Sequence, residues 1–322
     1  MELNPLKLRL GIYVPMYKGW VKGVEEGESD PTFKYAAETV IKAEEIGIDS
    51  IWVADHLLNP QKGERGKSLE AWTTLTALAA ITKKVELFHT TLCQGFRYPA
   101  VLAKMCATLD DVSNGRYRFN LGAGWFKREF QSYGVPWDED HDTRIDRARE
   151  QIEIIKSLWT QPTTNYKGRF YEITNGILEP KPLQKPHPPI WWAGQSEKSR
   201  QLAADLADGW LMDSSTLQEA EEKVLDMTRR LEGKGRRIQY AIPGRIYMDK
   251  TEDDAKKRVE KLVGSDCNLL EEILTQDFVG SPQDIADRLQ RLSDIGFDYV
   301  IFSPSPALKT LGEIEEKLIP IL

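Results

Sequence analysis

The chain has 322 residues, of which 41% are hydrophobic and 29% are charged, and its formal net charge is −7. This length suits one domain over residues 1–322, and the mild acidity argues against a nucleic-acid-binding protein, which needs a basic face. The three cysteines have no metal-ligand spacing, and neither a secretory leader nor a membrane-length apolar run is evident. We therefore expect a cytoplasmic protein without a metal site and without a membrane or nucleic-acid partner.

Strands and helices are predicted to alternate along the first half of the chain. Apolar runs mark the strands, and apolar positions at helical spacing mark the helices. The predicted strands are Lys7–Pro15, Ile48–Ala54, Val85–Cys93 and Tyr117–Leu121. The predicted helices are Thr32–Gly47, Ser68–Thr82 with Ser68 as N-cap, Pro99–Val112 and Asp142–Trp159.

The alternation is interrupted by an excursion, Thr160–Pro189, that is rich in proline, glycine and aromatic residues and contains a strand-like piece, Arg169–Ile173. The predicted strands then resume with Pro189–Ala193, Gly209–Met212, Ile238–Met248 and Asp298–Phe302. The predicted helices are Glu197–Ala207, Leu217–Gly233, Glu252–Val263, Pro282–Gly296 and Leu311–Leu318, with Ser265–Phe278 as an irregular or helical insertion.

Eight strands, nearly all followed by helices, predict a (β/α)8 TIM barrel with insertions. A doubly wound sheet is the main alternative. It would usually carry a phosphate loop after its first strand, but the turn there reads PMYKGW and has no Gly-x-Gly-x-x-Gly. In a barrel, functional side chains gather where the strands end.

One such strand end carries the run NLGAGWFKREF, which begins at Asn120. The third glycine of a dinucleotide turn is missing, and we expect a loop around Tyr133 to Pro136 instead of an immediate helix, so a Rossmann turn is rejected. The two glycines either admit a flat ligand or form a tight turn. The amide of Asn120 either bonds a neighbouring strand or loop or faces a ligand.

Two further strand ends carry polar groups. The run AGQS places Gly194, Gln195 and Ser196 before a helix, where backbone N–H groups favour an anion, although Ser196 could be an ordinary N-cap. The run WVADH ends another strand with Asp55 and His56. Histidine suits proton transfer near neutral pH, whereas the alternative is a loop-capping aspartate beside an exposed histidine.

Other polar and aromatic residues give weaker signals. His89 lies within a predicted strand and fits a core histidine better than a site histidine, and Trp191 and Trp192 are expected to face the core on one side and a pocket on the other. Arg97 could present a charge at the barrel mouth, and Arg144 opens a long helix beside acidic residues.

The chain resembles the bacterial luciferase-like, flavin-dependent monooxygenases. The resemblance is greatest to the two-component branch of dimethylsulfone, alkanesulfonate and pyrimidine monooxygenases. The resemblance rests on five segments that span most of the chain in order. They are Met105–Gly134, Leu158–Ile173, Leu178–Ser196, Ala204–Trp210 and Phe278–Phe302, together with the N-terminal GIYVP and IWVADH. The sequence departs from the alkanesulfonate members after the last strand, where it reads FSPSP, which argues against a sulfonate substrate.

The resemblance implies a TIM barrel that binds reduced FMN at the carboxyl ends of its strands. It assigns the phosphate to Gly194, Gln195 and Ser196, the isoalloxazine to Ala54 and Asp55, and further flavin contacts to Asn120, Glu129 on a loop, and Arg144. It also assigns a catalytic role to His56, and Arg97 is expected to hold an anionic or polar substrate.

The implied reaction begins with reduced FMN (FMNH2) from a separate NAD(P)H-dependent flavin reductase. It reacts with O2 to a C4a-(hydro)peroxyflavin, which oxygenates a small organic substrate, with an organosulfur compound as one candidate. The reaction needs a pocket closed to water, to which the segments around Lys18–Lys67 and Ser265–Phe278 could contribute. The alternatives are a coenzyme F420-dependent oxidoreductase and a non-catalytic flavin-binding paralogue, and a homodimer or homotetramer is expected.

Overall fold

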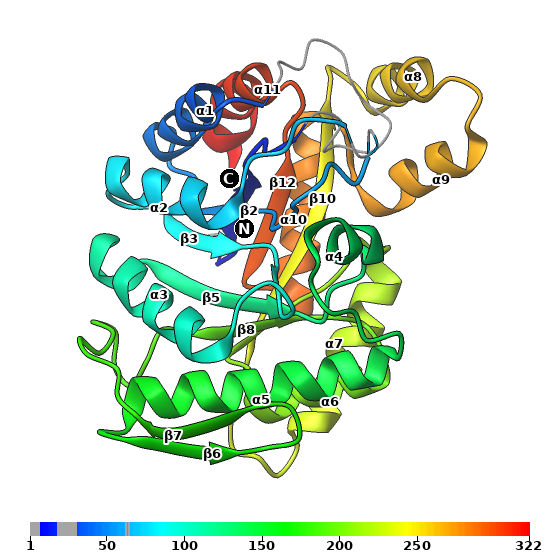
Figure 1. Cartoon of the computed structure of the whole chain (residues 1–322). Helices are drawn as coiled ribbons and strands as arrows, with labels where there is room; N and C mark the ends of the chain where they lie inside the picture. Colours follow the sequence, from blue (N-terminus) through cyan, green and yellow to red (C-terminus); the bar gives the residue numbers. More distant parts are fainter. Residues whose placement is uncertain (1–6, 18–30, 62, 64) are drawn as a thin grey trace.

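The computed structural model describes residues 7–17, 31–61, 63 and 65–322. In this part of the chain, eight parallel strands follow one another around a barrel (Figure 1). They are β1 (Arg9–Tyr13), β2 (Ser50–Val53), β3 (Glu86–His89), β5 (Tyr117–Gly122), β8 (Ile190–Ala193), β9 (Gly209–Leu211), β10 (Gln239–Met248) and β12 (Tyr299–Ser303). The barrel closes because β12 pairs with β1, with Arg9 opposite Tyr299. The predicted TIM-barrel fold is confirmed.

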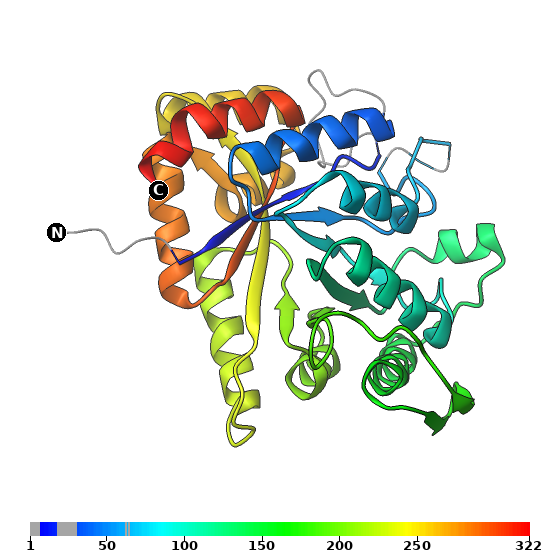
Figure 2. The ribbon, with the colours of Figure 1, turned by 90° about the vertical axis from the view of Figure 1, so that its left-hand side faces the viewer.

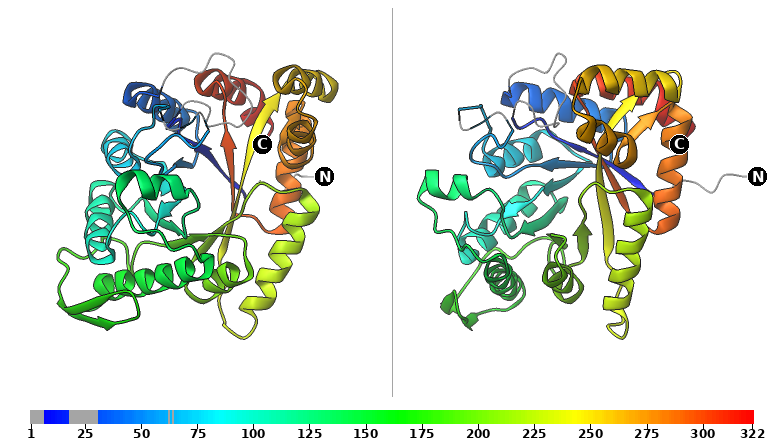
Figure 3. Two further views of the ribbon diagram at one scale, coloured as in Figure 1. Left: turned by 45° about the vertical axis from the view of Figure 1, so that its right-hand side comes forward. Right: turned by 90° about the vertical axis from the view of Figure 1, so that its right-hand side faces the viewer.

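A ring of helices covers the outside of the barrel, as the views from different sides show (Figures 2 and 3). They are α1 (Phe33–Glu45), α2 (Ala71–Ile81), α3 (Pro99–Val112), α5 (His141–Thr160), α6 (Glu197–Leu206), α7 (Leu217–Leu231), α8 (Glu252–Val263), α10 (Pro282–Ile295) and α11 (Ala307–Glu313). Each lies within a few residues of a predicted helix, since amphipathic spacing is a strong signal over ten or more residues.

A cluster of aromatic side chains fills the inside of the barrel. Trp52 stacks on Phe88 with ring centroids 3.7 Å apart, and Trp191 meets Tyr299 edge-on at 5.4 Å. These side chains come from four different strands and belong to one buried cluster, against which Tyr13 and Ala193 pack. Because Tyr13 and Ala193 also line the cavity described below, the cluster forms the floor of that cavity. Trp191 and Trp192 are fully buried and do not line the cavity, so the expectation that one face lines a pocket is wrong.

Several short elements interrupt the strand–helix repeat. They are β4 (Leu92–Cys93), α4 (Lys127–Tyr133), the antiparallel pair β6 (Thr164–Lys167) and β7 (Glu172–Gly176), α9 (Cys267–Gln276) and β11 (Phe278–Gly280). The chain ends in a π-helical turn, Ile314–Leu318, and a 3₁₀ turn, Ile319–Ile321. The β6–β7 hairpin lies beside α5 (Figure 1). The short strand β11 pairs in parallel with the second half of the long strand β10, and α9 packs against β11.

Four local predictions need correction. The run Val85–Cys93 is divided into β3 and β4 at Thr90–Thr91, and the excursion contains two strands rather than the single piece Arg169–Ile173. Ser68 is not the N-cap of α2; the carboxylate of Glu70 accepts from the backbone N–H groups of Trp72 and Thr73 instead.

The fourth correction concerns the loop expected after Gly124, which contains α4. This helix has only 7 residues and its N-cap residue, Phe126, provides no capping side chain, so the sequence carried no start signal. Its end is marked by Gly134 with φ 66°, a left-handed conformation that favours glycine. Residues 18–30, 62 and 64 of the segment expected to shield the pocket lie outside the described residues.

Candidate active site

A cavity of about 450 Å³ opens at the carboxyl ends of the barrel strands. Its walls come from the ends of β1, β2, β3, β5, β8 and β9, from β10, from α4 and from the first residue of α5. This volume lies within the range of about 300–1,000 Å³ that is usual for small-molecule sites. Four of the residues predicted from the sequence line the cavity: Asp55, His56, Glu129 and Gly194.

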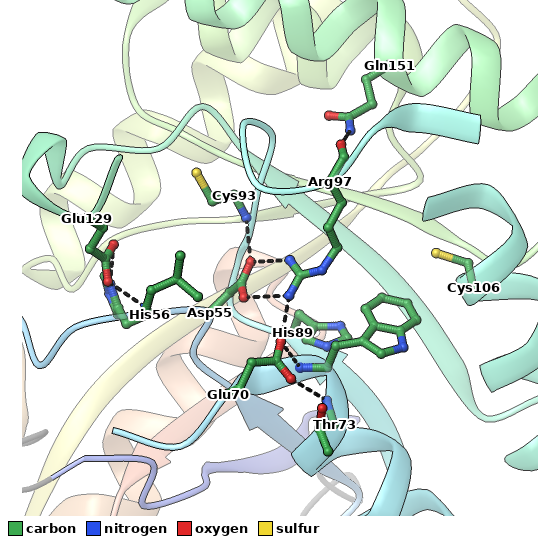
Figure 4. Close-up of polar contacts among 12 residues, drawn as sticks. Asp55, His56, Glu70, Thr73, His89, Cys93, Arg97, Cys106, Glu129 and Gln151 are labelled. Atoms are coloured by element: carbon green, nitrogen blue, oxygen red, sulfur yellow. Dashed lines mark hydrogen bonds and ion pairs between the residues drawn. The ribbon is translucent and has the colours of Figure 1, made fainter. Parts of the chain in front are cut away.

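His56 is held by a buried carboxylate from α4. Its Nδ1 lies 3.1 Å from both carboxylate oxygens of Glu129, whose side chain is 3% exposed (Figure 4). The same carboxylate accepts from the backbone N–H groups of Leu57 at 2.7 Å and Leu58 at 2.9 Å. A carboxylate only accepts, so Nδ1 carries the hydrogen and Nε2 is the nitrogen that can exchange a proton. Glu129 thus lies on a helix, not on the expected loop.

Asp55, the other acidic residue beside His56, is engaged with Arg97. The guanidinium donates to both carboxylate oxygens, at 2.7 and 3.0 Å, and to Glu70 at 2.8 Å (Figure 4). Burial disfavours the charged guanidinium, but the two carboxylates outweigh it and raise the pKa of Arg97. Asp55 also accepts from the N–H of Cys93 at 3.0 Å.

The geometry therefore gives Arg97 a different place from the one expected. It does not line the cavity, and its charge is already matched by two carboxylates. Its guanidinium joins Asp55, the cavity residue, to Glu70, the N-cap of α2.

The turn after β8 has the features of an anion site. Ser196 is the N-cap of α6, and its Oγ accepts from the N–H of Ser199 at 3.3 Å. Gly194, with φ 152°, lines the cavity with Ser199, and a Cβ at Gly194 would lie 2.0 Å from the Oγ of Ser199. Both side-chain polar atoms of Gln195 are buried and have no partner among the described residues. The helix N-terminus and this unpaired amide can bind an anion.

Small residues line the wall next to this turn. Gly122, Ala123 and Gly124 line the cavity at the end of β5, so a flat ring can approach their backbone. Asn120 lies two residues before Gly122 on β5 and is fully buried. Its Nδ2 donates a hydrogen bond to the carbonyl of His89 at 3.0 Å. Its Oδ1 has no partner among the described residues, and its side chain does not line the cavity.

Four other predicted site residues lie outside the cavity lining: Ala54, Gln195, Ser196 and Arg144. Ala54 is half-buried at the end of β2, and Ser196 faces the start of α6. Arg144 donates to the carbonyls of Asp138 and Glu139 at 2.6 and 3.1 Å, and its guanidinium stacks 4.1 Å from the ring centre of Trp137. Arg144 therefore braces the segment between α4 and α5.

His89 is a core residue, as favoured from the sequence. It is fully buried and stacks on Trp72 with ring centres 4.9 Å apart. Burial, with a smaller contribution from the charge of Arg97, lowers its pKa well below the usual value, so it stays neutral. The chain's cysteines are unpaired, and burial raises the pKa of Cys93, which lines the cavity, to about 12. Its thiol is therefore protonated at neutral pH.

Two cavity residues were missed although their positions could have revealed them. Tyr13 ends β1, and Asp213 lies two residues beyond the end of β9. The rule that located Asp55 at a strand end applies equally to both. Burial raises the pKa of Tyr13 to about 12, so its phenol stays protonated.

A closed (β/α)8 barrel with a cavity at its strand ends, a helix N-terminus beside that cavity and a carboxylate-held histidine in its wall is an arrangement typical of barrel enzymes. A sequence model described as Luciferase-like monooxygenase matches residues 16–299. The chain belongs to this family of flavin-dependent monooxygenases and oxidoreductases. No helix in the described ranges has the length and apolar character needed to cross a bilayer.

Three proteins to which this chain is similar carry different names and activities. The FMNH2-dependent dimethylsulfone monooxygenase of Pseudomonas putida is 28% identical over 265 residues, which cover 72% of each chain. The F420-dependent glucose-6-phosphate dehydrogenase of Amycolatopsis mediterranei is 35% identical over 178 residues, 55% of this chain and 52% of the other. The crystal structure of riboflavin lyase with modified FMN and riboflavin has a TM-score of 0.84 at 18% identity and covers 98% of this chain and 91% of the other.

Proposed function

We propose that this protein is an FMNH2-dependent monooxygenase that uses O2 to oxygenate a small organic molecule. The observation that carries the proposal is the turn Gly194–Ser199 at the wall of the cavity, next to the small residues Gly122–Gly124. It offers an anion site and a flat wall side by side, which fits a phosphate joined to a planar ring. The similarity to the dimethylsulfone monooxygenase supports FMNH2 as the cofactor and makes an organosulfur compound one candidate substrate.

In this proposal the phosphate is bound by the backbone at Gly194, Gln195 and Ser196. The helix α6 has 10 residues, and its N-terminus carries the positive end of the helix dipole. Gln195 adds a side-chain amide that has no hydrogen-bond partner among the described residues. The absence of a side chain at Gly194 keeps the space beside Ser199 open. The isoalloxazine would lie between the Gly122–Gly124 wall and Asp55.

In this proposal three predicted site residues act from outside the cavity lining: Ala54, Asn120 and Arg144. Asn120 holds the backbone of His89 beside the Gly122–Gly124 wall, and Arg144 fixes the segment that leads from α4 into α5. Ala54 leaves space beside Asp55. We therefore propose that these three residues position the site, and that the isoalloxazine ring is contacted by the cavity-lining residues.

Bound reduced flavin would supply the two electrons that activate O2. The protein provides the proton control: Glu129 fixes the ring of His56 through Nδ1, and Nε2 then donates or accepts the proton of the reaction. The aromatic rings of Trp125 and Phe126 lie edge-on to His56, with ring centres 5.7 and 6.4 Å away. With Glu129 they surround much of the imidazole, so that only 15% of the His56 side chain is exposed.

The proposal is tested with a reductase that supplies reduced FMN under air, where oxygen uptake and oxygenated product are measured together. We expect His56→Ala to lower product formation at least about tenfold, the effect of losing a general acid or base, and to divert oxygen to hydrogen peroxide. His187→Ala is the matched control, since His187 lies outside the cavity lining. Unchanged product yield in His56→Ala would contradict the proton role.

A coenzyme F420-dependent oxidoreductase is the second candidate, favoured by the 35% identity to an F420-dependent dehydrogenase. It would transfer hydride and consume no oxygen. A non-catalytic flavin-binding protein would bind FMN without consuming oxygen in the reductase assay. As a monooxygenase, the protein would need an NAD(P)H-dependent flavin reductase as its partner, and we propose a homodimer or homotetramer as its assembly.

A further inference from the structure

One carboxylate in the cavity wall has no role in the site described so far. Asp213 follows β9, lines the cavity and is exposed to it. The other two cavity carboxylates are engaged, Asp55 with Arg97 and Glu129 with His56 and two backbone N–H groups. Among the described residues, neither a charged side chain nor a backbone N–H group donates a hydrogen bond to the carboxylate of Asp213.

The loop that carries Asp213 is fixed on both sides. The N–H of Met212 donates to the carbonyl of Ala241 at 2.9 Å, and the hydroxyl of Ser214 donates to the carbonyl of Pro243 at 3.2 Å. The hydroxyl of Ser215 donates to the carbonyl of Asp213 itself at 3.0 Å. The backbone that carries the carboxylate is therefore held at a defined place in the wall, as a specificity-determining residue requires.

The charges around Asp213 do not balance it. Protein atoms crowd the carboxylate although the cavity reaches it, and this desolvation raises the pKa of Asp213 despite the opposing charge of Lys223. The ammonium of Lys223 donates to the hydroxyl of Ser215 at 2.6 Å. The charge of Asp213 in turn contributes, after burial, to the raised pKa of Tyr13, so the carboxylate acts across the barrel mouth on the end of β1.

The other residues that line the cavity add to its excess of negative charge. Within the described chain, no lysine or arginine lines the cavity, whereas three carboxylates do. The aromatic rings of Tyr13, Trp125 and Phe126 also line it, and such rings attract cations. A sulfonate or carboxylate substrate would meet repulsion here, and a group with N–H donors would find a partly desolvated acceptor.

We propose that Asp213 makes this enzyme select a substrate that donates a nitrogen-bound hydrogen to the carboxylate, as a protonated amine or a neutral amide does, over an anionic substrate. The proposal rests on the proposed function, because it assigns Asp213 to the substrate side of an FMN site. It also predicts that Asp213 contributes little to the binding of FMN, because the phosphate of FMN is assigned to the turn Gly194–Ser199.

The test measures the dissociation constants of three probes of similar shape: benzylamine as the cation, benzamide as the neutral N–H donor and benzenesulfonate as the anion. They are measured on the protein with and without FMN, for the native chain, Asp213→Asn and Asp213→Lys. The exposed Asp111 on α3, replaced in Asp111→Asn, is the matched control for the loss of one negative charge.

We expect the native protein to bind benzylamine at least about tenfold more tightly than benzenesulfonate, since a charge-assisted hydrogen bond has about that effect. Asp213→Asn removes the preference, Asp213→Lys inverts it, and Asp111→Asn leaves it unchanged. Tighter binding of benzamide than of benzylamine would identify a neutral N–H donor as the preferred form, and the reverse would identify a cation.

Three results would overturn the inference: no preference in the native protein, an unchanged preference in both Asp213 variants, or a loss of FMN affinity in Asp213→Asn as large as the loss of probe affinity. If FMN fails to bind but the charge preference holds in the free cavity, the proposed function is wrong and the assignment of Asp213 stands.

Discussion

Glu129 is the residue on which the geometry of the cavity depends most. Its carboxylate receives three donors, the Nδ1 of His56 and the backbone N–H groups of Leu57 and Leu58, from the segment that follows β2. It therefore fixes both the histidine ring and the backbone that carries it. Removing the acceptor leaves three partly buried donors without a partner, and each costs no more than the lower part of the about 1–3 kcal/mol that a fully buried group would cost.

We expect Glu129→Ala to lower the free energy of unfolding by about 2–4 kcal/mol, because two backbone donors and one ring donor lose their acceptor. Glu129→Gln keeps an oxygen for the backbone donors but offers an N–H group to His56. It should therefore cost less stability than Glu129→Ala while still reducing turnover. Urea unfolding and the reductase assay check both, with Gln131→Ala on the exposed side of α4 as control. Equal losses of stability in the two Glu129 variants would contradict the role of the backbone bonds.

Single residues were predictable where a general rule places them. Asp55 and His56 were found because they end a strand, and Gly194 because backbone N–H groups gather before a helix. The partner of Arg97 was not predictable, since its two carboxylates come from segments 42 and 27 residues earlier in the chain. Pairings over such distances depend on packing, which one sequence does not reveal.

At the scale of elements, the outer helices are tied by charged side chains. Asp205 at the end of α6 accepts from Arg149 of α5 at 2.8 Å, from Gln201 at 2.9 Å and from Lys234 after α7. Burial alone would raise its pKa, but these donors outweigh it and lower the pKa of Asp205 from 3.8 to about 2. Because the folded-state pKa is the lower one, the ionised group stabilises the fold above about pH 4, and this stability is lost as the pH falls toward 2.

We expect Asp205→Asn to cost about 1 kcal/mol at pH 7, because solvent screens these partly exposed ion pairs and leaves about half of what a pKa difference of nearly two units would give. The difference in unfolding free energy between the native chain and the variant should shrink by about 0.5 kcal/mol between pH 5 and pH 3. Denaturant unfolding across this range checks it, with the exposed Asp294→Asn as control. A difference that stays constant with pH would contradict the ion pairs as its source.

A second element contact fastens α9 and β11 to the barrel. Arg245 on β10 pairs with the fully buried carboxylate of Asp277 and, at 2.8 Å, with Glu272, whose side chain is 37% exposed. We expect Asp277→Ala to cost about 3–5 kcal/mol, because it leaves a buried guanidinium without its main partner. Glu272→Ala should cost less than about 1 kcal/mol. Thermal and urea unfolding compare the two, and similar costs would show that burial does not decide the contribution here.

The elements themselves were predictable in proportion to their length. Helices such as Pro99–Val112 and Glu252–Val263 match the prediction because amphipathic spacing repeats over several turns. The 7-residue α4 and the β6–β7 hairpin did not, since short elements take their conformation from tertiary contacts. This loss affects function directly, because Glu129 lies on α4.

For the whole molecule, the alternation of strands and helices was enough to predict a closed barrel and the edge at which its cavity lies. The substrate and the choice between FMN and F420 were not predictable, because one fold hosts many functions and the similar proteins include an FMNH2-dependent and an F420-dependent enzyme. The fold therefore locates the cavity in which a reaction would take place, and the residues that bind ligands there must be tested directly.

The most direct test of this account is a binding titration with FMN and with coenzyme F420, followed by fluorescence and by the shift in melting temperature, for the native chain, Gly194→Ala and Gly312→Ala. Gly312→Ala is the control, because a Cβ there meets no atom within 4 Å. We expect FMN to bind more tightly than F420, Gly194→Ala to weaken FMN at least about tenfold and Gly312→Ala to leave it unchanged. Tighter binding of F420, or FMN affinity unaffected by Gly194→Ala, would contradict the account.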